Sequence, residues 1–514
     1  MAKKGSRQGL PVYQRDYLVD LEVHDLKLFP SQDVKNKELD ATHAVYDENI
    51  DEWIFRRATY SGIKALLKLD LLWRHERESE ENWDRRRREM YSFGYTKSIV
   101  DLFTFYLFKH EVERQLGTLS EDPLWQLFMD DCDLYGTELD EYLNEQSKYA
   151  SIYGHVGVLV DKPVDSSTVD EEGNERTVTR TRADDVKNGL YPYLAAYHPP
   201  SILDWQYARD KANRPYLAYL KLLDDEGRYR CWWPDKWEVW QKDEENEDGD
   251  DKAILVAEGV NTLGVIPFVW LYNEKTEIIG MGESDVEDIA HIELAIIRNL
   301  SQGEEVINYS AFPMLLLPKE RVGQESSDEV GVKAILEFDP ENPNAKPEWM
   351  TPEVSGPITS ILQWISRKVA EIYRASNAGG MSSTELSTDA KSGAALEAEF
   401  QLLNSKLCKK AVQLEKAELG VIYFWLHWQR MQAKYKDVMI RRERKYDVEN
   451  LARDLADDLT AMTIVTSQLF KAEIQKTVAR RMLPAVADET MDAIDAEIEA
   501  GPVEDDLGVE EADA

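Results

Sequence analysis

The chain has 514 residues, of which 98 are acidic and 61 are basic, and its formal net charge at pH 7 is −37. With 43% hydrophobic and 10% aromatic residues it can bury a large core, so we expect a folded protein and not a disordered one. The acidic surplus repels polyanions and argues against sequence-specific nucleic-acid binding, which needs lysine and arginine contacts to phosphates.

The first 110 residues predict an arm followed by helices. Residues 1–50 carry Pro11, Pro30 and scattered charges with little periodicity, and we expect an arm or a loosely packed strap. Residues 53–73 place apolar side chains at helical spacing and predict a helix. The run 85–88 is four arginines, which suits either a phosphate contact or a solvated helix face among nearby acidic residues, and we favour the second. The apolar and aromatic stretch 95–108 predicts a buried helix.

From residue 151 the pattern changes to short β-strands separated by turn residues. His198 begins a Pro-Pro and Trp stretch that predicts a turn, and we expect both His155 and His198 to be ordinary core or surface residues. The acidic segment 243–251 resembles the first half of an EF-hand loop, but Leu255 stands where a bidentate glutamate is required, so we favour a solvated hairpin tip. Strands are predicted at 157–160, 193–197, 216–222, 229–233, 237–240 and 253–256.

The middle of the chain predicts two helices with an insert between them. Ser284 and Glu287 have the spacing of a capping box, and apolar residues recur every three or four positions up to Leu300. Prolines and a run of apolar residues in 311–351 predict a β-containing excursion. A second helix is expected from Ser355, with a proline in its first turn. Its predicted apolar face is Ile358, Ile361, Leu362, Ile365, Val369 and Ile372.

A loop and a very long helix follow. Residues 376–391 are mostly small and polar, which predicts a mobile loop. From Ser392 to Trp428 the helical period is almost unbroken, giving a helix on the order of 50–60 Å long. A single domain seldom needs a helix of this length, so we expect it to pack against copies of itself or to span a large assembly.

The C-terminal region alternates in charge. Residues 430–445 are basic, and two interpretations stay open: a contact strip for a polyanion, or a balance for acidic neighbours in a ring. Residues 451–482 predict a further helix. Residues 485–514 contain acidic residues and no basic one, and we expect a disordered, solvating tail.

The order helix, β excursion, helix, Gly/Ser loop and long helix resembles the core of tailed-bacteriophage portal proteins, the head-to-tail connector family. The most specific local match is the opening of the long helix, SGAAL at 392–396, together with IPFV at 266–269 shortly before GESD at 282–285. The resemblance covers roughly residues 85–500. It rests on element order and these short patterns and not on catalytic signatures.

The resemblance implies an α+β portal fold with a mixed wing, a two-helix stem, a small clip and a helical crown. It also implies that Asn377, Met381, Thr384 and Glu385 of the tunnel loop lie near DNA, with Lys391 as the loop's single lysine at its far end. The implied parts are an N-terminal arm and wing (1–280), stem helix 1 (281–310), clip (311–353), stem helix 2 (354–375), tunnel loop (376–391), long wing helix (392–435), crown (436–484) and acidic tail (485–514).

The implied function is that of a homo-oligomeric ring, typically dodecameric, at one capsid vertex of a virion. Such a ring conducts double-stranded DNA without sequence specificity during packaging and ejection. The implied partners are the terminase, the major capsid protein and head-completion or adaptor proteins, and before assembly the subunit would lie in the host cytoplasm. The rival interpretations are an acidic helical scaffold or adaptor in virion assembly, and a nucleic-acid-processing enzyme whose site is diffuse in sequence.

The motifs that would indicate an enzyme or a metal site are missing from the sequence. There is no phosphate-binding P-loop, no nucleophile elbow and no dinucleotide-binding glycine turn. The three cysteines, Cys132, Cys231 and Cys408, lie far apart and form no zinc spacing. No run of 18 apolar residues occurs, and no apolar segment follows the basic N-terminus. We therefore expect no catalytic activity, no cofactor, no metal and no membrane contact.

Overall fold

The structure is a computed structural model that describes residues 34–76, 78–163, 167–169, 175–177, 181–242, 252–311, 314–318, 335–338, 348–350, 355–377, 393–444, 446, 460, 462–464, 466–483, 486 and 488–500. Helices and several small sheets together confirm the predicted α+β class. The chain divides into two compact units, Met1–Tyr446 and Asp447–Ala514.

The N-terminal helices begin earlier than predicted. After the short α2 (Asn36–Leu39), helix α3 (Ala44–Ser61) starts where the His43 ring accepts a hydrogen bond from the Val45 amide at 3.2 Å. The single helix predicted at 53–73 is wrong, because Gly62 adopts φ +94 and ends α3. The chain resumes as α4 (Ile63–Leu66) and the 3-10 turn η1 (Leu67–Leu69).

The arginine run lies on α5 (Glu80–Glu89), as the helix-face interpretation predicts, but one of its members is buried. Arg86 pairs with Glu78 at 2.7 Å and donates to the carbonyl of Trp73 at 2.6 Å. Arg88 is exposed. The predicted buried helix over 95–108 is confirmed as α6 (Tyr95–Leu107), whose Ile99, Val100 and Phe103 are buried.

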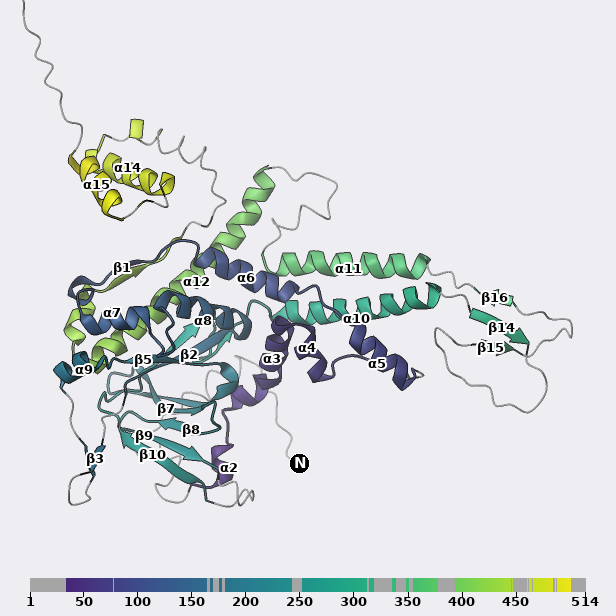
Figure 1. Ribbon diagram of the computed structural model, residues 1–514, viewed down its shortest axis with the longest axis horizontal. Coiled ribbons are helices and arrows are strands. Elements are labelled where there is room, and N and C mark those ends of the chain that lie inside the picture. The colour runs from purple at the N-terminus through teal and green to yellow at the C-terminus, as the bar shows by residue number, and fades with distance from the viewer. Residues whose placement is uncertain are drawn as a thin grey trace, which may run out of the picture. The chain divides into compact units, whose positions relative to one another are not determined.

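Two antiparallel sheets form the β part of the first unit (Figure 1). One has three strands in the order β11-β2-β5, and the other has five strands in the order β10-β9-β8-β7-β6. All six predicted strands are confirmed, while β6 and β11 were not expected. The turn predicted after His198 is only the short η3 (Pro199–Ser201), and β6 follows at once. The strands are β2 (His155–Asp161), β5 (Tyr193–Tyr197), β6 (Ile202–Arg209), β7 (Pro215–Leu223), β8 (Tyr229–Trp232), β9 (Lys236–Gln241), β10 (Ile254–Val260) and β11 (Phe268–Tyr272).

Smaller sheets join distant parts of the chain. β1 (Glu113–Gln115) pairs with β17 (Met439–Arg441), β12 (Glu274–Lys275) with β13 (Gly282–Glu283), and β3 (Ser167–Val169) with β4 (Glu175–Thr177). The predicted β excursion after the first middle helix is confirmed as a sheet of β15 (Ile335–Phe338), β14 (Met314–Pro318) and β16 (Glu348–Met350). The acidic hairpin tip predicted at 243–251 lies outside the described residues.

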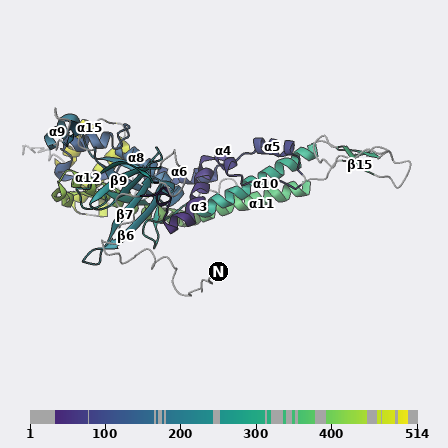
Figure 2. The same ribbon diagram turned by 90° about the horizontal axis from the view of Figure 1, so that it is seen from below.

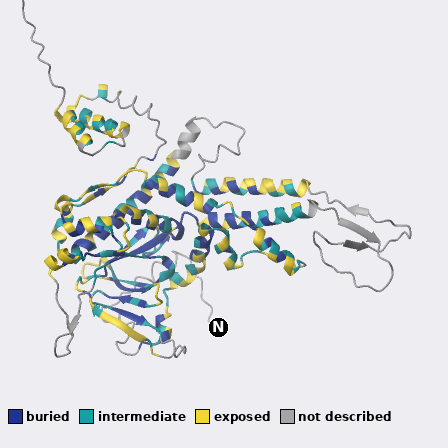
Figure 3. Cartoon of the chain, in the orientation of Figure 1, coloured by how far each residue is buried: buried dark blue, intermediate teal, exposed yellow. Residues whose placement is uncertain are grey.

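Several further helices belong to this unit. They are η2 (Gly117–Leu119), α7 (Pro123–Asp130), α8 (Leu139–Tyr153), α9 (Arg182–Asn188), α10 (Glu287–Ala311), α11 (Ser355–Ala375), α12 (Gly393–Trp428) and η5 (Gln432–Asp437). Helices α10 and α11 lie side by side in both views and form a hairpin (Figures 1 and 2). The buried positions of α10 end at Ser301 and those of α11 begin at Ile365, so only one half of each hairpin helix is dark blue in Figure 3.

The long helix α12 packs inside its own chain, which corrects the prediction that sister subunits bury its stripe. Leu407, Ala411 and Trp425 are completely buried in a cluster that also contains residues of α6, α7, α8, β2 and β11. The Trp425 ring meets Trp125 of α7 edge-on at 5.0 Å between centroids. Ile289 of α10 belongs to the same cluster. Periodicity identified the buried faces, but these elements of the same chain cover them.

The two histidines weighed from the sequence differ in burial. His155 is fully buried in the core, and burial lowers its pKa to about 3. His198 is half-buried against Tyr149 and Tyr153, and burial lowers its pKa to about 4. Of the core and surface positions considered from the sequence, His155 takes the core one.

The second unit contains α14 (Gln468–Met482) and α15 (Asp488–Ala500). Helix α15 contradicts the predicted disordered tail over its own length, and residues 501–514 lie outside the described residues. The helix places Met491, Ile494 and Ile498 on one side at helical spacing. Cations of α14 offset its acidic charge, in the pairs Lys476–Glu499 at 2.5 Å and Arg480–Asp495 at 2.7 Å. Of the helix predicted at 451–482, α14 is confirmed, and residues 447–459 lie outside the described part.

Candidate functional site

The α10–α11 hairpin and its junction with α12 form the candidate site. The two hairpin helices approach closely at Gly303, where an added Cβ would lie 3.6 Å from the Ile361 side chain. Lys368 of α11 also donates to the Ala295 carbonyl of α10 at 3.3 Å. These two contacts join α10 to α11.

Helix α11 is covered on one side only. Ile365, Val369 and Ile372 are its buried apolar residues, spaced four and three positions apart as one face of a helix requires. Leu362 was predicted on this face, but it is 57% exposed together with Trp364 at 52%. Leu362 lies at the margin of the buried face, and the described residues leave more than half of its side chain exposed.

Cations flank the exposed indole. The Arg367 guanidinium lies 5.8 Å and the Lys368 ammonium 5.7 Å from the centre of the Trp364 ring. Both distances are within the range of cation–π attraction. Leu362 and Trp364 are two positions apart and therefore point to different sides of α11, and the positive charge accompanies Trp364.

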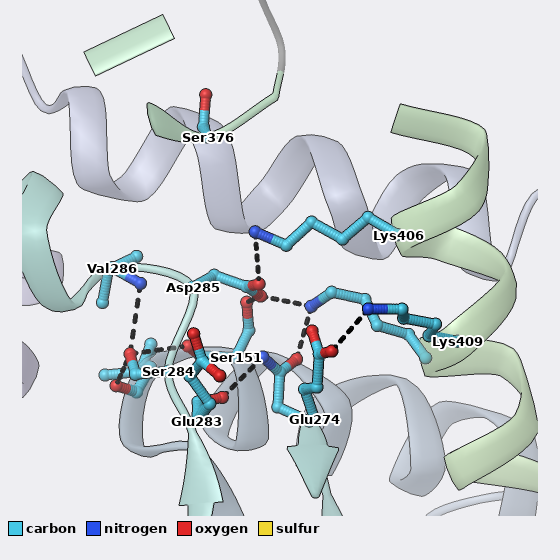
Figure 4. Close-up of polar contacts among 12 residues, drawn as sticks. Ser151, Glu274, Glu283, Ser284, Asp285, Val286, Ser376, Lys406 and Lys409 are labelled. Atoms are coloured by element: carbon cyan, nitrogen blue, oxygen red, sulfur yellow. Dashed lines mark hydrogen bonds and ion pairs between the residues drawn. The ribbon is translucent and has the colours of Figure 1, made fainter. Parts of the chain in front are cut away.

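A buried ion cluster fastens the base of the hairpin to α12 (Figure 4). Asp285, two residues before α10, accepts from Lys406 at 3.0 Å, from Lys410, and from the Ser151 hydroxyl of α8. Lys410 also donates to the side-chain carbonyl of Asn273. The Asp285 and Lys410 side chains are almost completely buried. The cluster thus joins three separate parts of the chain at one point.

The charges of the cluster determine its protonation. Burial acts to raise the pKa of Asp285, but the adjacent ammonium groups of Lys410 and Lys406 outweigh it and hold that pKa well below its usual range. Asp285 is therefore ionised at neutral pH. A buried ion pair of this kind is costly to break, because one partner would be left charged and unpaired.

The predicted capping box at the start of α10 is wrong. The Ser284 hydroxyl accepts from the Val286 amide at 3.1 Å and donates to the Ile152 carbonyl at 2.7 Å. Glu287 instead pairs with Arg56 of α3 at 3.2 Å. Ser284 is used to attach the segment before α10 to the end of α8, so it is not available as a helix cap.

A second buried ion cluster lies farther along α12. Glu418 is fully buried and pairs with Arg114 at 2.6 Å and with Arg442 at 2.8 Å. The nearby Glu415 pairs with Arg444 at 2.5 Å. Two arginines of the basic region 430–445 therefore neutralise acidic residues of the same chain. Neither the polyanion contact nor the balance between ring neighbours considered from the sequence includes this role.

The predicted DNA-contacting residues fall mostly outside the described part. Asn377 lies two residues after the end of α11, has φ +60, and its amide donates to the Arg374 carbonyl at 3.2 Å. Met381, Thr384, Glu385 and Lys391 lie within 378–392, outside the described residues.

Sequence reasoning missed Asp285, Lys406 and Lys410. One signal was present, because Lys406 and Lys410 are four residues apart on a helix and stand directly beside the buried Leu407 and Ala411. Two lysines at that spacing next to an apolar stripe predict a buried anion. Nothing in the local sequence identifies Asp285 as that anion, since it lies more than 100 residues earlier.

The described residues show neither a metal cluster nor a membrane-spanning helix. Within the described residues, no group of three or more His, Cys, Asp or Glu side chains could hold a metal ion. No described helix is both long and apolar enough to span a membrane.

Comparison with known proteins finds similarity among solved structures. No family model matches the chain, and no curated protein matches it. A chain in the solved structure "Virion of native gene transfer agent (GTA) particle" is similar at 8% sequence identity and a TM-score of 0.38. The match covers 80% of this chain and 98% of that chain.

Proposed function

We propose that this protein is a viral portal protein, which forms a homo-oligomeric ring at one capsid vertex and conducts the genome during packaging and ejection. The observation that carries the proposal is the α10–α11 hairpin. Its base is held by a buried ion cluster, and α11 exposes two large apolar residues, Leu362 and Trp364. Large apolar side chains that stay exposed on two sides of a helix suit contacts with neighbouring subunits.

A ring provides partners for these exposed side chains. In a closed ring each copy presents one surface to one neighbour and a different surface to the other. Helix α11 carries the exposed cation Arg367, whereas α10 opens with the exposed acid Asp288. Opposite charge on two surfaces of one subunit favours head-to-tail contact between copies.

The acidic surplus suits a channel. A wall that repels phosphates lets double-stranded DNA slide without sequence preference, since tight binding needs counterion release by lysine and arginine. In this proposal the segment 376–391, from Asn377 to Lys391, faces the DNA. The ring is dodecameric, the β-containing segment 311–353 docks the terminase and later head-completion proteins, and the major capsid protein surrounds the ring. The protein has no catalytic role or cofactor and resides in the virion.

Negative-stain electron microscopy of the purified protein tests the proposal. We expect rings with a central hole wide enough for a DNA duplex. Rods or monomers under every assembly condition would refute it and favour an acidic scaffold or adaptor. Nucleotide- and metal-dependent hydrolysis that is lost on changing one carboxylate would identify an enzyme instead.

The contribution of Trp364 can be tested separately. Trp364→Asp should abolish rings and leave a folded monomer, because an exposed side chain contributes little to the monomer's own stability. Leu469→Asp is the matched control, since Leu469 is also exposed but lies in the second unit. Rings that persist in Trp364→Asp would show that another surface holds the copies together.

A further inference from the structure

A cavity opens between α5 and α10 on one side of the hairpin. Its volume is about 330 Å³, its open mouth included, and Met90, Tyr91 and Leu300 form its apolar walls. Met90 is buried, whereas Tyr91 is 38% exposed and so reaches the surface. A recess bounded by a thioether and an aromatic ring suits a planar aromatic side chain.

The mouth of the cavity is acidic. Glu89 is an exposed member of its lining, and Glu304 accepts from the Tyr91 hydroxyl at 2.9 Å. Within the part of the chain that the structure describes, neither carboxylate forms an ion pair. A cation on an incoming side chain would therefore be attracted to the mouth.

Two arginines also line the cavity, but nearby acids engage both of them. Arg86 pairs with Glu78 at 2.7 Å. Arg85 attracts the Glu305 carboxylate, which also pairs with His75 at 3.5 Å. These arginines therefore leave the acidic charge at the mouth in place.

Helices α5 and α11 lie on opposite sides of α10 (Figures 1 and 2). Gly303 of α10 faces Ile361 of α11, and Ser301 accepts from the Arg86 guanidinium of α5 at 3.4 Å. Residues two positions apart on a helix point about 200° apart around its axis. Trp364, which is 52% exposed on α11, therefore cannot enter the cavity of its own copy, because α10 lies between them.

Trp364 and the cavity lie at the same level along the hairpin. Toward the base of the hairpin, residue numbers fall in α10 and rise in α11. Leu300 is three residues from Gly303 in that direction, and Trp364 is three residues from Ile361 in the same direction. A hairpin that lies along a ring axis meets its neighbours over its full length, and rotation about that axis leaves each residue at its own level.

We propose that Trp364 of each copy inserts into the α5–α10 cavity of the next copy, and that Arg367 then lies beside Glu89. This contact presupposes the ring proposed above and identifies the surface that receives Trp364. A tryptophan that fills a pocket, with an arginine nearby, is a common centre of binding energy in protein interfaces. The inserting and receiving surfaces differ, as head-to-tail contact requires.

Arg367 brings a cation to the acidic mouth. Its guanidinium lies 5.8 Å from the centre of the Trp364 ring, so it accompanies the indole. Arg367 is three residues beyond Trp364 toward the base of the hairpin. Glu89 also lies on that side of the cavity, since the chain runs from it to Ser92, which donates to Glu293 nearer the base. The two charges therefore meet at a similar level.

Photo-cross-linking of the full chain tests the contact. p-Benzoylphenylalanine in place of Trp364 keeps an aromatic side chain, and under ultraviolet light it inserts into C–H bonds that it touches, with a preference for methionine. In rings of this variant we expect links between copies, to a peptide that contains Met90 and Tyr91. The matched control is the same replacement of Leu362, which is 57% exposed but points to a different side of α11. We expect roughly tenfold fewer links to that peptide from the control.

Electron microscopy of the unaltered protein separates this contact from the proposed function. Rings in which position 364 links to other segments would overturn the contact and leave the portal proposal standing. Monomers of the unaltered protein under every assembly condition would refute the portal proposal and this contact with it. Links to Met90 within one chain, which run at monomer size on a denaturing gel, would also overturn the contact.

Charge reversal tests the same contact with Trp364 in place. Arg367→Glu and Glu89→Arg should each raise the subunit concentration at half assembly roughly tenfold, because each variant brings like charges together. The two changes combined should restore that concentration to within about threefold of the unaltered protein. Unchanged assembly in both single variants, or a combined variant no better than either, would overturn the proposal.

Discussion

Replacing Lys410 by methionine should destabilise the protein far more than the same change at the adjacent Lys409. Both lysines are on α12 and both form ion pairs. The Lys410 side chain is 5% exposed and faces the buried Asp285, whereas Lys409 is 60% exposed and pairs with Glu274 at the surface at 2.7 Å. The comparison therefore isolates burial from charge, helix propensity and side-chain length.

The magnitudes follow from the surroundings of each pair. Removing one partner of a buried pair costs about 3–5 kcal/mol, and we expect about 3 kcal/mol for Lys410→Met because Lys406 remains 3.0 Å from Asp285. For Lys409→Met we expect less than about 1 kcal/mol, as for other exposed pairs. Urea unfolding followed by tryptophan fluorescence measures both changes at pH 7. Equal losses for the two variants would refute the buried-pair reasoning.

The pH dependence gives a second test of the same pair. The pKa of Asp285 in the folded state lies below its unfolded value of about 3.9, so the pair's contribution is complete above that value and is lost as pH falls through the folded pKa. In Lys410→Met, protonation of Asp285 relieves the unpaired charge. The stability difference between the unaltered protein and Lys410→Met should therefore narrow below about pH 4, and a constant difference would contradict the assignment.

Three further variants test other parts of the fold. Burial lowers the pKa of His155 to about 3, so only the unfolded state takes up a proton at this residue as pH falls below about 6.5. The folded protein therefore loses roughly 1.4 kcal/mol of stability per pH unit in this range because of His155. His155→Asn should remove that loss, as measured by urea unfolding at pH 7, 6 and 5. Gly154→Ala should destabilise by several kcal/mol more than Gly227→Ala, because both glycines have positive φ but only at Gly154 would a Cβ lie 2.1 Å from a backbone oxygen; equal unfolding midpoints would argue against that contact. On α12, Leu407→Ala should cost about 2–5 kcal/mol and the exposed Leu402→Ala less than about 1, and thermal unfolding that ranks them the other way would mean that the stripe is not packed within the chain.

Sequence periodicity predicted which faces are buried but not what covers them. Ile365, Val369 and Leu407 were identified as buried positions because apolar residues recur at helical spacing. Whether a face meets another part of the chain or another copy depends on contacts between distant segments, so the stripe of α12 was wrongly assigned to sister subunits. Leu362 shows the same limit on a smaller scale, since a residue at the margin of a stripe can be covered or exposed.

Polar contacts were harder to predict than apolar ones. Ser284 and Glu287 had the spacing of a helix cap, but the hydroxyl bonds to α8 and the carboxylate to Arg56. Both outcomes depend on residues more than 100 positions away, which the local pattern does not contain. The acidic stretch that forms α15 was likewise judged by its charge alone, although its partners Lys476 and Arg480 were visible in the preceding helix.

The two ion clusters on α12 fix the position of this helix along its own axis. Lys410 and Glu418 are eight residues apart, which is about 12 Å along the helix. A slide of one helical turn, about 5.4 Å, would separate Lys410 from Asp285 and Glu418 from Arg442 at the same moment. The two ion pairs therefore hold α12 at two places along its length. We expect a displacement of the hairpin base to move α12, and with it the β1–β17 pair, as one body.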